Sequence, residues 1–92
     1  MNFICPAIGE DYKKDFLVTG SIDDFKIIVF SNMDQYEKGF KYLKLTEHKP
    51  CEVSKELFTE LSKNDDAFSG IIVDIHSENK IITKKELLEE LF

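Results

Sequence analysis

The run Ile71-Ile72-Val73 constrains the fold more than any other stretch of this chain. Side chains alternate between the two faces of a β-strand, so an uninterrupted apolar run is apolar on both faces. A strand of that kind usually lies in the middle of a sheet that is covered on both sides. Gly70 precedes the run and Asp74 ends it. The stretch 70–76 therefore predicts a central strand whose burial stops at Asp74.

Four further segments have the composition or the alternation of strands: 2–9, 15–22, 25–31 and 40–47. The second and third are rich in β-branched and aromatic residues and flank Asp23-Asp24, which predicts a hairpin. Pro6, in the first, has no N–H for a ladder, which favours an edge position or the end of a pairing.

Capping signals predict the first two helices. Asn32, with Gln35 three residues later, begins the first helix, and Gly39 is expected to end it. The segment 48–51 is expected to be a loop, and Ser54 then caps the second helix. Val53 before that cap and Phe58 after it form a hydrophobic staple. The apolar stripe of this helix comprises Leu57, Phe58 and Leu61.

The third helix has the clearest start signal. Thr83 and Glu86 form a capping box, and Ile82 with Leu87 forms a staple. Three leucines are expected to face the core: Leu87, Leu88 and Leu91. The pattern as a whole predicts a single α+β domain over residues 1–92, with about five strands in a mostly antiparallel or mixed sheet and three short helices.

The charge balance disfavours two classes of partner. The 92 residues carry 18 acids against 12 lysines, with no arginine, for a net charge of −6. Arginine and a basic surface supply most of the grip on phosphate, so neither a nucleic acid nor an anionic membrane is expected as a partner. No apolar run reaches the ~18 residues of a membrane span, and the first residues lack a basic start before their apolar stretch. We expect a soluble, cytoplasmic protein.

The cysteines and histidines do not form a recognisable metal motif. Cys5 and Cys51 are expected to be reduced, buried thiols in a protein of this kind. His48 precedes Cys51 with a spacing that suits half of a zinc site, and Cys5 with His76 would have to supply the other half. That second pair is too widely spaced for an ordinary structural zinc site. We therefore expect no metal. The sequence has no Gly-rich phosphate-binding loop, so we expect no nucleotide cofactor either.

The pair Asp74 and His76 admits two interpretations. On a strand the two side chains would share one side, so the acid could orient the imidazole for catalysis or both could bind a ligand. No nucleophile in a recognisable motif accompanies them. The alternative is a polar surface rim of Asp74, His76 and Ser77, where the central strand leaves the core and can contact a partner.

The charges of the closing helix are inverted relative to its dipole. Lys84 and Lys85 lie at its start, whereas Glu89 and Glu90 lie near its end. Each such charge costs roughly 0.3–1 kcal/mol when exposed. A charged face that meets a partner is one reason for such a pattern.

At this point the order of elements resembles the N-terminal domain of the SseB (enhanced serine sensitivity) family. The resemblance covers nearly the whole chain through four stretches: "FICPAI" (3–8), "IIVFSNMDQYEKG" (27–39), "GIIVDIHS" (70–77) and "ITKKELLEEL" (82–91). Asp74-Ile75-His76 stands where the family commonly has an Asn-Pro-Gly turn. The resemblance implies the α+β fold, and it implies no reaction, cofactor or catalytic residue.

These observations predict a non-enzymatic module that binds another protein, as a regulator or an immunity-type inhibitor. A second copy of the chain is a further candidate partner. The partner-binding residues are expected to be Asp74, His76, Ser77, Lys84, Lys85, Glu89 and Glu90. The alternative is a small enzyme or ligand-binding domain that uses Asp74 and His76. A concave pocket with other polar groups beside Asp74 would favour that alternative.

Overall fold

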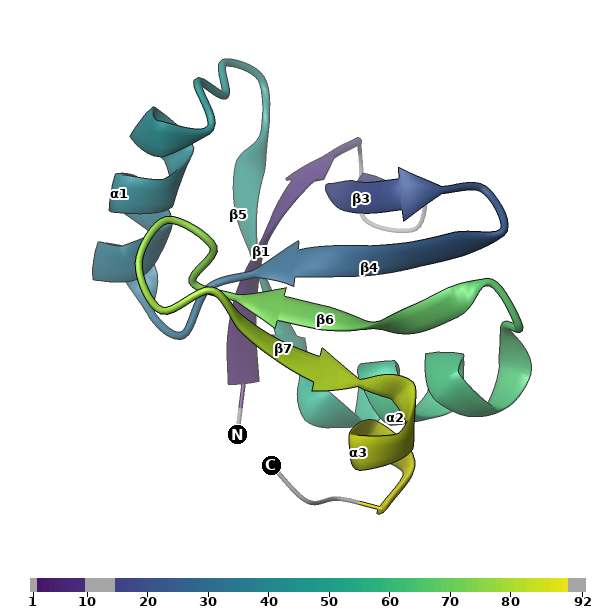
Figure 1. Cartoon of the computed structure of the whole chain (residues 1–92). Coiled ribbons are helices and arrows are strands. Elements are labelled where there is room, and N and C mark those ends of the chain that lie inside the picture. Colours follow the sequence, from purple (N-terminus) through teal and green to yellow (C-terminus); the bar gives the residue numbers. More distant parts are fainter. Residues whose placement is uncertain (1, 10–14, 90–92) are drawn as a thin grey trace.

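A computed structural model of the chain describes residues 2–9 and 15–89. They form one α+β domain (Figure 1) with strands and helices in an interleaved order. The elements are β1 (Asn2–Ile8), β2 (Asp15–Phe16), β3 (Val18–Ser21), β4 (Asp24–Val29), α1 (Met33–Tyr42), β5 (Lys49–Ser54), α2 (Lys55–Asn64), β6 (Phe68–Val73), β7 (Lys80–Thr83) and α3 (Lys84–Glu89).

The predicted α+β class is confirmed, and the strands lie in two sheets rather than in one. One sheet has the order β2-β1-β5 and is antiparallel, and the other has the order β3-β4-β6-β7 with a parallel β4–β6 pair. The predicted hairpin is present as β3 and β4, joined at Ile22 and Asp23. The predicted central strand is β6, which lies between β4 and β7. It ends at Val73, so neither Asp74 nor His76 belongs to a strand.

The two sheets are joined at two places. Leu17 separates β2 from β3, so one extended segment pairs first with β1 and then with β4. Ile4 and Phe30 also exchange backbone hydrogen bonds of 2.8 Å in each direction. Pro6 lies where the β1–β2 pairing ends, because Ala7 and Ile8 are the residues paired with β2. Its missing N–H therefore removes no ladder bond on that side.

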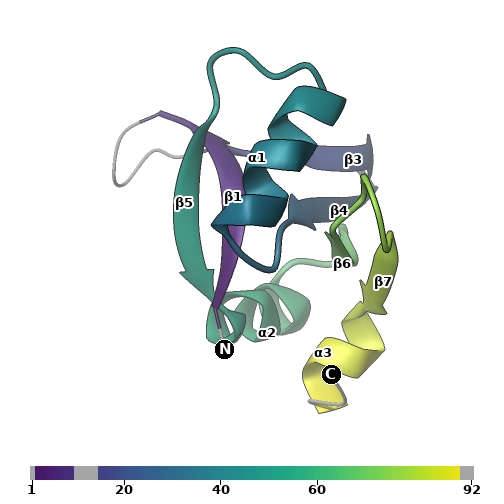
Figure 2. The ribbon, with the colours of Figure 1, turned by 90° about the vertical axis from the view of Figure 1, so that its left-hand side faces the viewer.

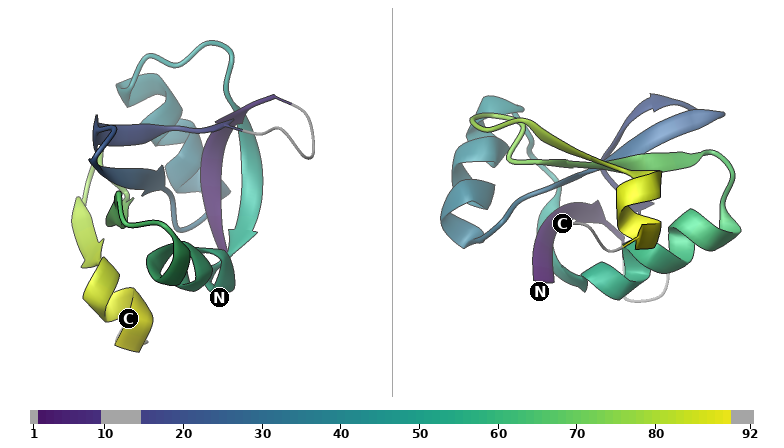
Figure 3. Two further views of the ribbon diagram at one scale, coloured as in Figure 1. Left: turned by 90° about the vertical axis from the view of Figure 1, so that its right-hand side faces the viewer. Right: turned by 60° about the horizontal axis from the view of Figure 1, so that its bottom comes forward.

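The helices lie on opposite sides of the strands. Helix α1 stands at one end of the molecule, whereas α2 and α3 pack against each other and against β6 (Figures 1–3). The larger core includes Phe3, Phe58, Phe68 and Leu87 on the α2 and α3 side. A smaller core of Ile28, Phe30 and Tyr36 lies beneath α1. Successive residues of β4 enter different cores, which explains why its sequence is apolar on both faces.

Local capping signals predicted two helix starts correctly. The side chain of Asn32 accepts a hydrogen bond from the Gln35 backbone N–H at 2.9 Å. Thr83 and Glu86 form the reciprocal capping box, with the Glu86 N–H donating to Thr83 Oγ1 at 3.2 Å. Ser54 occupies the cap position of α2, but its side chain makes no capping hydrogen bond there.

Gly39 does not end α1 as the sequence predicted. The helix continues to Tyr42, and Lys44 beyond it adopts the left-handed backbone with φ 57°. Gly39 is buried in the middle of the helix, and a Cβ at this position would overlap the ring of Phe30. Glycine is therefore needed here because α1 approaches the smaller core closely, and not because the helix ends at this residue.

Two further assignments from the sequence were wrong. The predicted strand 40–47 is instead the last turn of α1 followed by a turn. The predicted loop 48–51 contains the start of β5, which pairs along β1 from Asn2↔Ser54 to Ala7↔Lys49. β5 is an edge strand with few strand-forming residues, so its pairing with β1, rather than its own propensity, stabilises its extended conformation.

The closing helix begins where predicted, but its buried face differs. Leu87 is fully buried in the larger core, whereas Leu88 is 43% exposed. The prediction that Leu88 packs on the sheet was therefore wrong, and Leu91 lies outside the described residues. No described helix combines the length and the apolar character that a membrane crossing requires.

Candidate functional site

Asp74 lies at the carboxyl end of the parallel β4–β6 pair, and it is buried rather than on the surface. It is 4% exposed, and its backbone has a left-handed φ of 52°. Its carboxylate accepts two hydrogen bonds from Ser31, one from the backbone N–H at 3.0 Å and one from Oγ at 2.7 Å. A buried carboxylate needs such donors because desolvation is costly. Asp74 therefore ties the end of β6 to the end of β4, and the predicted exposed rim is wrong at this residue.

The segment after Asp74 is a tight turn held by backbone bonds. The Asp74 carbonyl oxygen accepts from the Ser77 N–H at 2.9 Å and from the Asn79 N–H at 2.8 Å. The Asp74 N–H donates to the Val29 carbonyl at 3.0 Å. Ser77 is exposed on this turn, as predicted for a rim residue.

His76 faces α1 instead of Asp74. Its Nε2 lies 2.8 Å from Gln35 Oε1, and its ring is centred 5.6 Å from that of Phe30. Its Nδ1 is buried and has no hydrogen-bond partner among the described residues. Because Ser31 holds the Asp74 carboxylate and Gln35 holds His76, the expected acid–imidazole pair is not formed. The arrangement that a catalytic use of both residues would require is therefore missing from the described structure.

A small hollow does open beside Asp74. It has a volume of about 250 Å³ and is lined by Phe3, Ser31, Val73, Asp74, Glu78, Lys80 and Ile82. Its polar groups could hold a small ligand. No imidazole belongs to the part of its lining that the structure describes, so the Ser31 hydroxyl lacks the usual general base of a serine nucleophile there. This hollow suits binding better than nucleophilic catalysis.

The charged residues of α3 do not form one free face. Lys84 is partly buried, and its Nζ donates to the Asp65 carbonyl oxygen at 3.1 Å, so it anchors α3 to the loop before β6. Lys85 and Glu89 are exposed. Glu90 lies outside the described residues.

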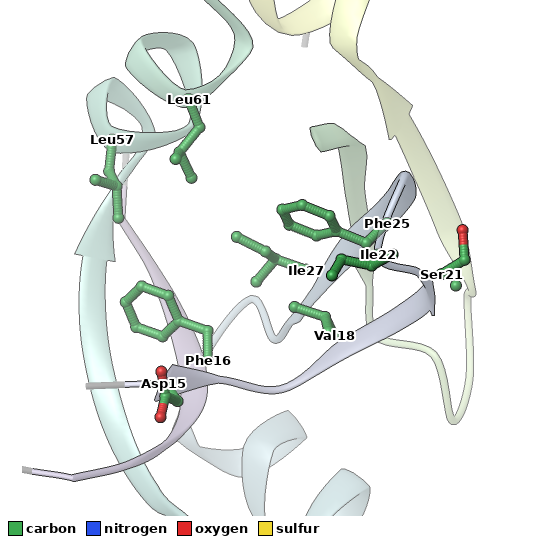
Figure 4. A pocket seen from close by; sticks show the side chains of 10 residues that line it. Asp15, Phe16, Val18, Ser21, Ile22, Phe25, Ile27, Leu57 and Leu61 are labelled. Atoms are coloured by element: carbon green, nitrogen blue, oxygen red, sulfur yellow. The ribbon is translucent and has the colours of Figure 1, made fainter. Parts of the chain in front are cut away.

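A larger apolar groove lies between the β2–β4 strands and α2 (Figure 4), and sequence reasoning missed it. Its volume is about 660 Å³, within the range of small-ligand sites. The lining residues are Asp15, Phe16, Val18, Gly20, Ser21, Ile22, Phe25, Ile27, Leu57 and Leu61. We call this feature the α2 groove.

The α2 groove follows from two simple periodicities. Val18 pairs with Ile27 and Gly20 pairs with Phe25 across the hairpin, so these positions share one face of the sheet. Leu57 and Leu61 are one helical turn apart and point from α2 toward that face (Figure 4). A Cβ at Gly20 would collide with the Asp24 carbonyl oxygen, so glycine is required at this point of the hairpin.

The α2 groove is an open extension of the larger core. Phe16, Phe25 and Leu61 are half-buried and pack against that core. Two residues nearer its mouth are unusually exposed for apolar side chains, since Ile22 is 88% exposed and Val18 is 47% exposed. A continuous apolar surface of this kind is the usual mark of a binding site.

The borders of the α2 groove are acidic. Four exposed acids lie in or next to its described lining: Asp15, Asp23, Glu56 and Glu60. Lys63 follows Leu61 on the same helix, and its Nζ lies 3.9 Å from Glu60 Oε1. Lys26 alternates with Phe25 and Ile27 along β4, so it belongs to the opposite face. The groove therefore combines an apolar floor with a negative rim.

A third hollow of about 430 Å³ lies between α1 and β5, with Tyr36, His48 and Pro50 in its lining. The Tyr36 hydroxyl and the His48 Nδ1 are both buried without a hydrogen-bond partner among the described residues. Burial raises the pKa of the Tyr36 hydroxyl above its ordinary value, so it stays protonated.

The candidate zinc residues are not gathered. Within the described residues no three His, Cys, Asp or Glu side chains are placed to hold a metal ion together. Cys5 and Cys51 do face each other as reduced thiols, whereas His76 lies against α1.

No family model, curated protein or solved structure matches the chain. The resemblance to the SseB N-terminal domain therefore stays a prediction from sequence.

Proposed function

We propose that this domain is a non-enzymatic protein-binding module that takes an amphipathic helix of another protein into the α2 groove. The observation that carries the proposal is an open apolar groove with Ile22 and Val18 at its mouth and acids along its borders. A partner that covers an exposed apolar surface removes it from water, which favours binding. This proposal keeps the interaction role expected from sequence and moves it from the Asp74 turn to a different surface.

The borders specify the charge of the partner. A helix that lays leucine-like residues at i, i+3, i+4 and i+7 on the groove floor directs its flanking residues toward the rim. Lysine or arginine at those flanking positions would meet Asp15, Glu56 and Glu60. Complementary charge raises the rate of encounter and excludes wrong partners. A second copy of this chain would bring the same acids to the rim, so a different, basic protein is the better partner.

A helix fits this surface better than an added strand. β-Strand addition uses the backbone groups of a sheet edge. The free edge of β3 is short and includes Gly20, whereas the exposed apolar atoms belong to the sheet face and to α2. The apolar area that a partner can bury therefore lies on the face of the sheet and on α2. A helix can cover such a face with its side chains.

The proposal can be tested with a defined probe. The probe is a synthetic peptide of leucine and lysine with the amphipathic helical spacing, and its control replaces each lysine with glutamate. We expect saturable binding of the lysine peptide by calorimetry and weak or no binding of the glutamate peptide. Replacing Ile22 and Leu57 together with serine should weaken binding by about tenfold or more, since each removes apolar contact worth ~1 kcal/mol or more.

The matched control is Ile81→Ser, which removes an equally apolar, half-exposed side chain on β7, outside the lining of the α2 groove. It should leave peptide affinity unchanged. Equal affinity of the Ile22 and Leu57 variant, or equal binding of both peptides, would show that the groove is not the site.

A second candidate function is small-ligand binding in the hollow beside Asp74, which the cluster of Ser31, Glu78 and Lys80 favours. Amide NMR spectra separate the two candidates. The lysine peptide should shift the signals of Ile22 and Leu57, whereas a ligand of the hollow should shift those of Ser31 and Glu78.

A further inference from the structure

Cys5 and Cys51 face each other across the β1–β5 ladder. They are direct partners in the antiparallel register, so their side chains lie on the same face of the sheet. Cys5 is fully buried in the larger core, and Cys51 is half-buried and packs against that core. The two residues are far apart in sequence, and the pairing of β5 with β1 brings them together.

The backbone bonds identify the kind of pair they form. Ile4 exchanges hydrogen bonds with Phe30, so its N–H and carbonyl point away from β5. Successive residues of a strand point their backbone groups to opposite sides, so the groups of Cys5 point toward β5. Cys5 and Cys51 are therefore a hydrogen-bonded pair, for which the Cα atoms lie about 5.5 Å apart. That separation falls in the usual disulfide range of about 4.4–6.8 Å.

We propose that Cys5 and Cys51 form an oxidisable dithiol site, which a small-molecule disulfide converts to a cross-strand disulfide within the folded domain. This inference rests on the strand register and does not depend on the α2 groove. The expectation from sequence that both thiols are reduced describes one of the two states of the site.

The burial of the two sulfurs sets the order of the steps. Burial, with the nearby Cys51 as a smaller cause, raises the pKa of Cys5 to about 12, so Cys5 remains a thiol at neutral pH. Cys51 is the more exposed of the two residues. Its thiolate attacks oxidised glutathione, forms a mixed disulfide and releases one glutathione thiolate.

The second step closes the site. The Cys5 sulfur loses its proton, attacks Cys51 Sγ and displaces the second glutathione as a thiolate. Two protein thiols are oxidised, one glutathione disulfide is reduced to two glutathiones, and the two thiol protons go to the released thiolates or to solvent. The high pKa of Cys5 makes this step slow, so the mixed disulfide at Cys51 should appear first.

The test incubates the reduced 92-residue chain with oxidised glutathione, followed by denaturation, alkylation and intact-mass measurement without reductant. We expect a monomeric product that lacks the mass of two hydrogen atoms and takes up no alkylating reagent. Restoring a thiol reductant should return both alkylation sites. The thermal midpoint of the oxidised protein should differ from that of the reduced protein, because the bond closes a long loop.

Two variants check the assignment. Cys5→Ala, chosen because position 5 is apolar and buried, should stop at the glutathione adduct on Cys51. Cys51→Ser should leave Cys5 unmodified while the domain is folded. Full alkylation of the wild type, a stable glutathione adduct on it, or disulfide-linked dimers as the main product would each overturn the proposal.

Discussion

At the scale of single residues, burial rather than residue type decides what the polar side chains do. Asp74 and His76 look alike in sequence, as polar residues two apart after an apolar run. In the structure Asp74 binds Ser31 and His76 binds Gln35. Their contacts come from segments about forty residues earlier in the chain, which no local pattern reveals. The pair consequently supports the fold, and a use in binding has to come from the exposed Ser77 side of the turn.

The role of Asp74 leads to the first stability prediction. Asp74→Ala removes the acceptor of the Ser31 N–H and Oγ, and it places alanine at a positive φ. We expect a loss of about 2–4 kcal/mol in the free energy of unfolding, measured by urea denaturation. Asp74→Asn keeps an acceptor and tolerates the backbone, so it should cost less. Asp66→Ala, at an exposed acid in the turn before β6, is the control and should be nearly neutral. Equal stability of the Asp74→Ala protein and the control would contradict this role.

At the scale of elements, the sequence was informative wherever a local interaction sets a boundary. The caps at Asn32 and at Thr83 were predicted because each cap bonds a residue three positions away. The end of α1 was predicted wrongly because Gly39 is required by its close contact with the ring of Phe30, a residue outside that helix. Strand β5 was missed because its pairing with β1 stabilises it more than its own residues do.

The closing helix gives a matched pair of substitutions. Leu87→Ala should lower the free energy of unfolding by about 2–5 kcal/mol, because it opens a cavity at a fully buried position. Leu88→Ala, on the next residue of the same helix, should cost less than about 1 kcal/mol, because that side chain is partly in solvent already. Both losses can be measured by thermal or urea unfolding. A reversed order would show that α3 is rotated about its axis.

At the scale of the whole molecule, the α2 groove could not be predicted, because its two walls are brought together only by the fold. The β3–β4 hairpin and α2 each showed ordinary apolar patterns, and neither pattern indicates that the two face each other across an open groove. What the sequence did provide was the acidic balance of the chain, with a net charge of −6. Several of the acids that produce this charge lie in or next to the described lining of the groove.

An apolar groove with an acidic rim should respond to salt in a characteristic way. Two copies of the domain that met groove to groove would bring like charges together, so the protein should be monomeric at low ionic strength. At ~1 M salt the screening length falls to about 3 Å, and the repulsion is largely removed. We expect weak self-association under that condition, measured by sedimentation velocity, and Ile22→Ser should reduce it. Binding of the lysine peptide should change in the opposite direction and weaken with salt, because attraction rather than repulsion is then screened. If salt shifts both equilibria the same way, or if dimers already form at low salt, the rim charges do not govern access to the groove.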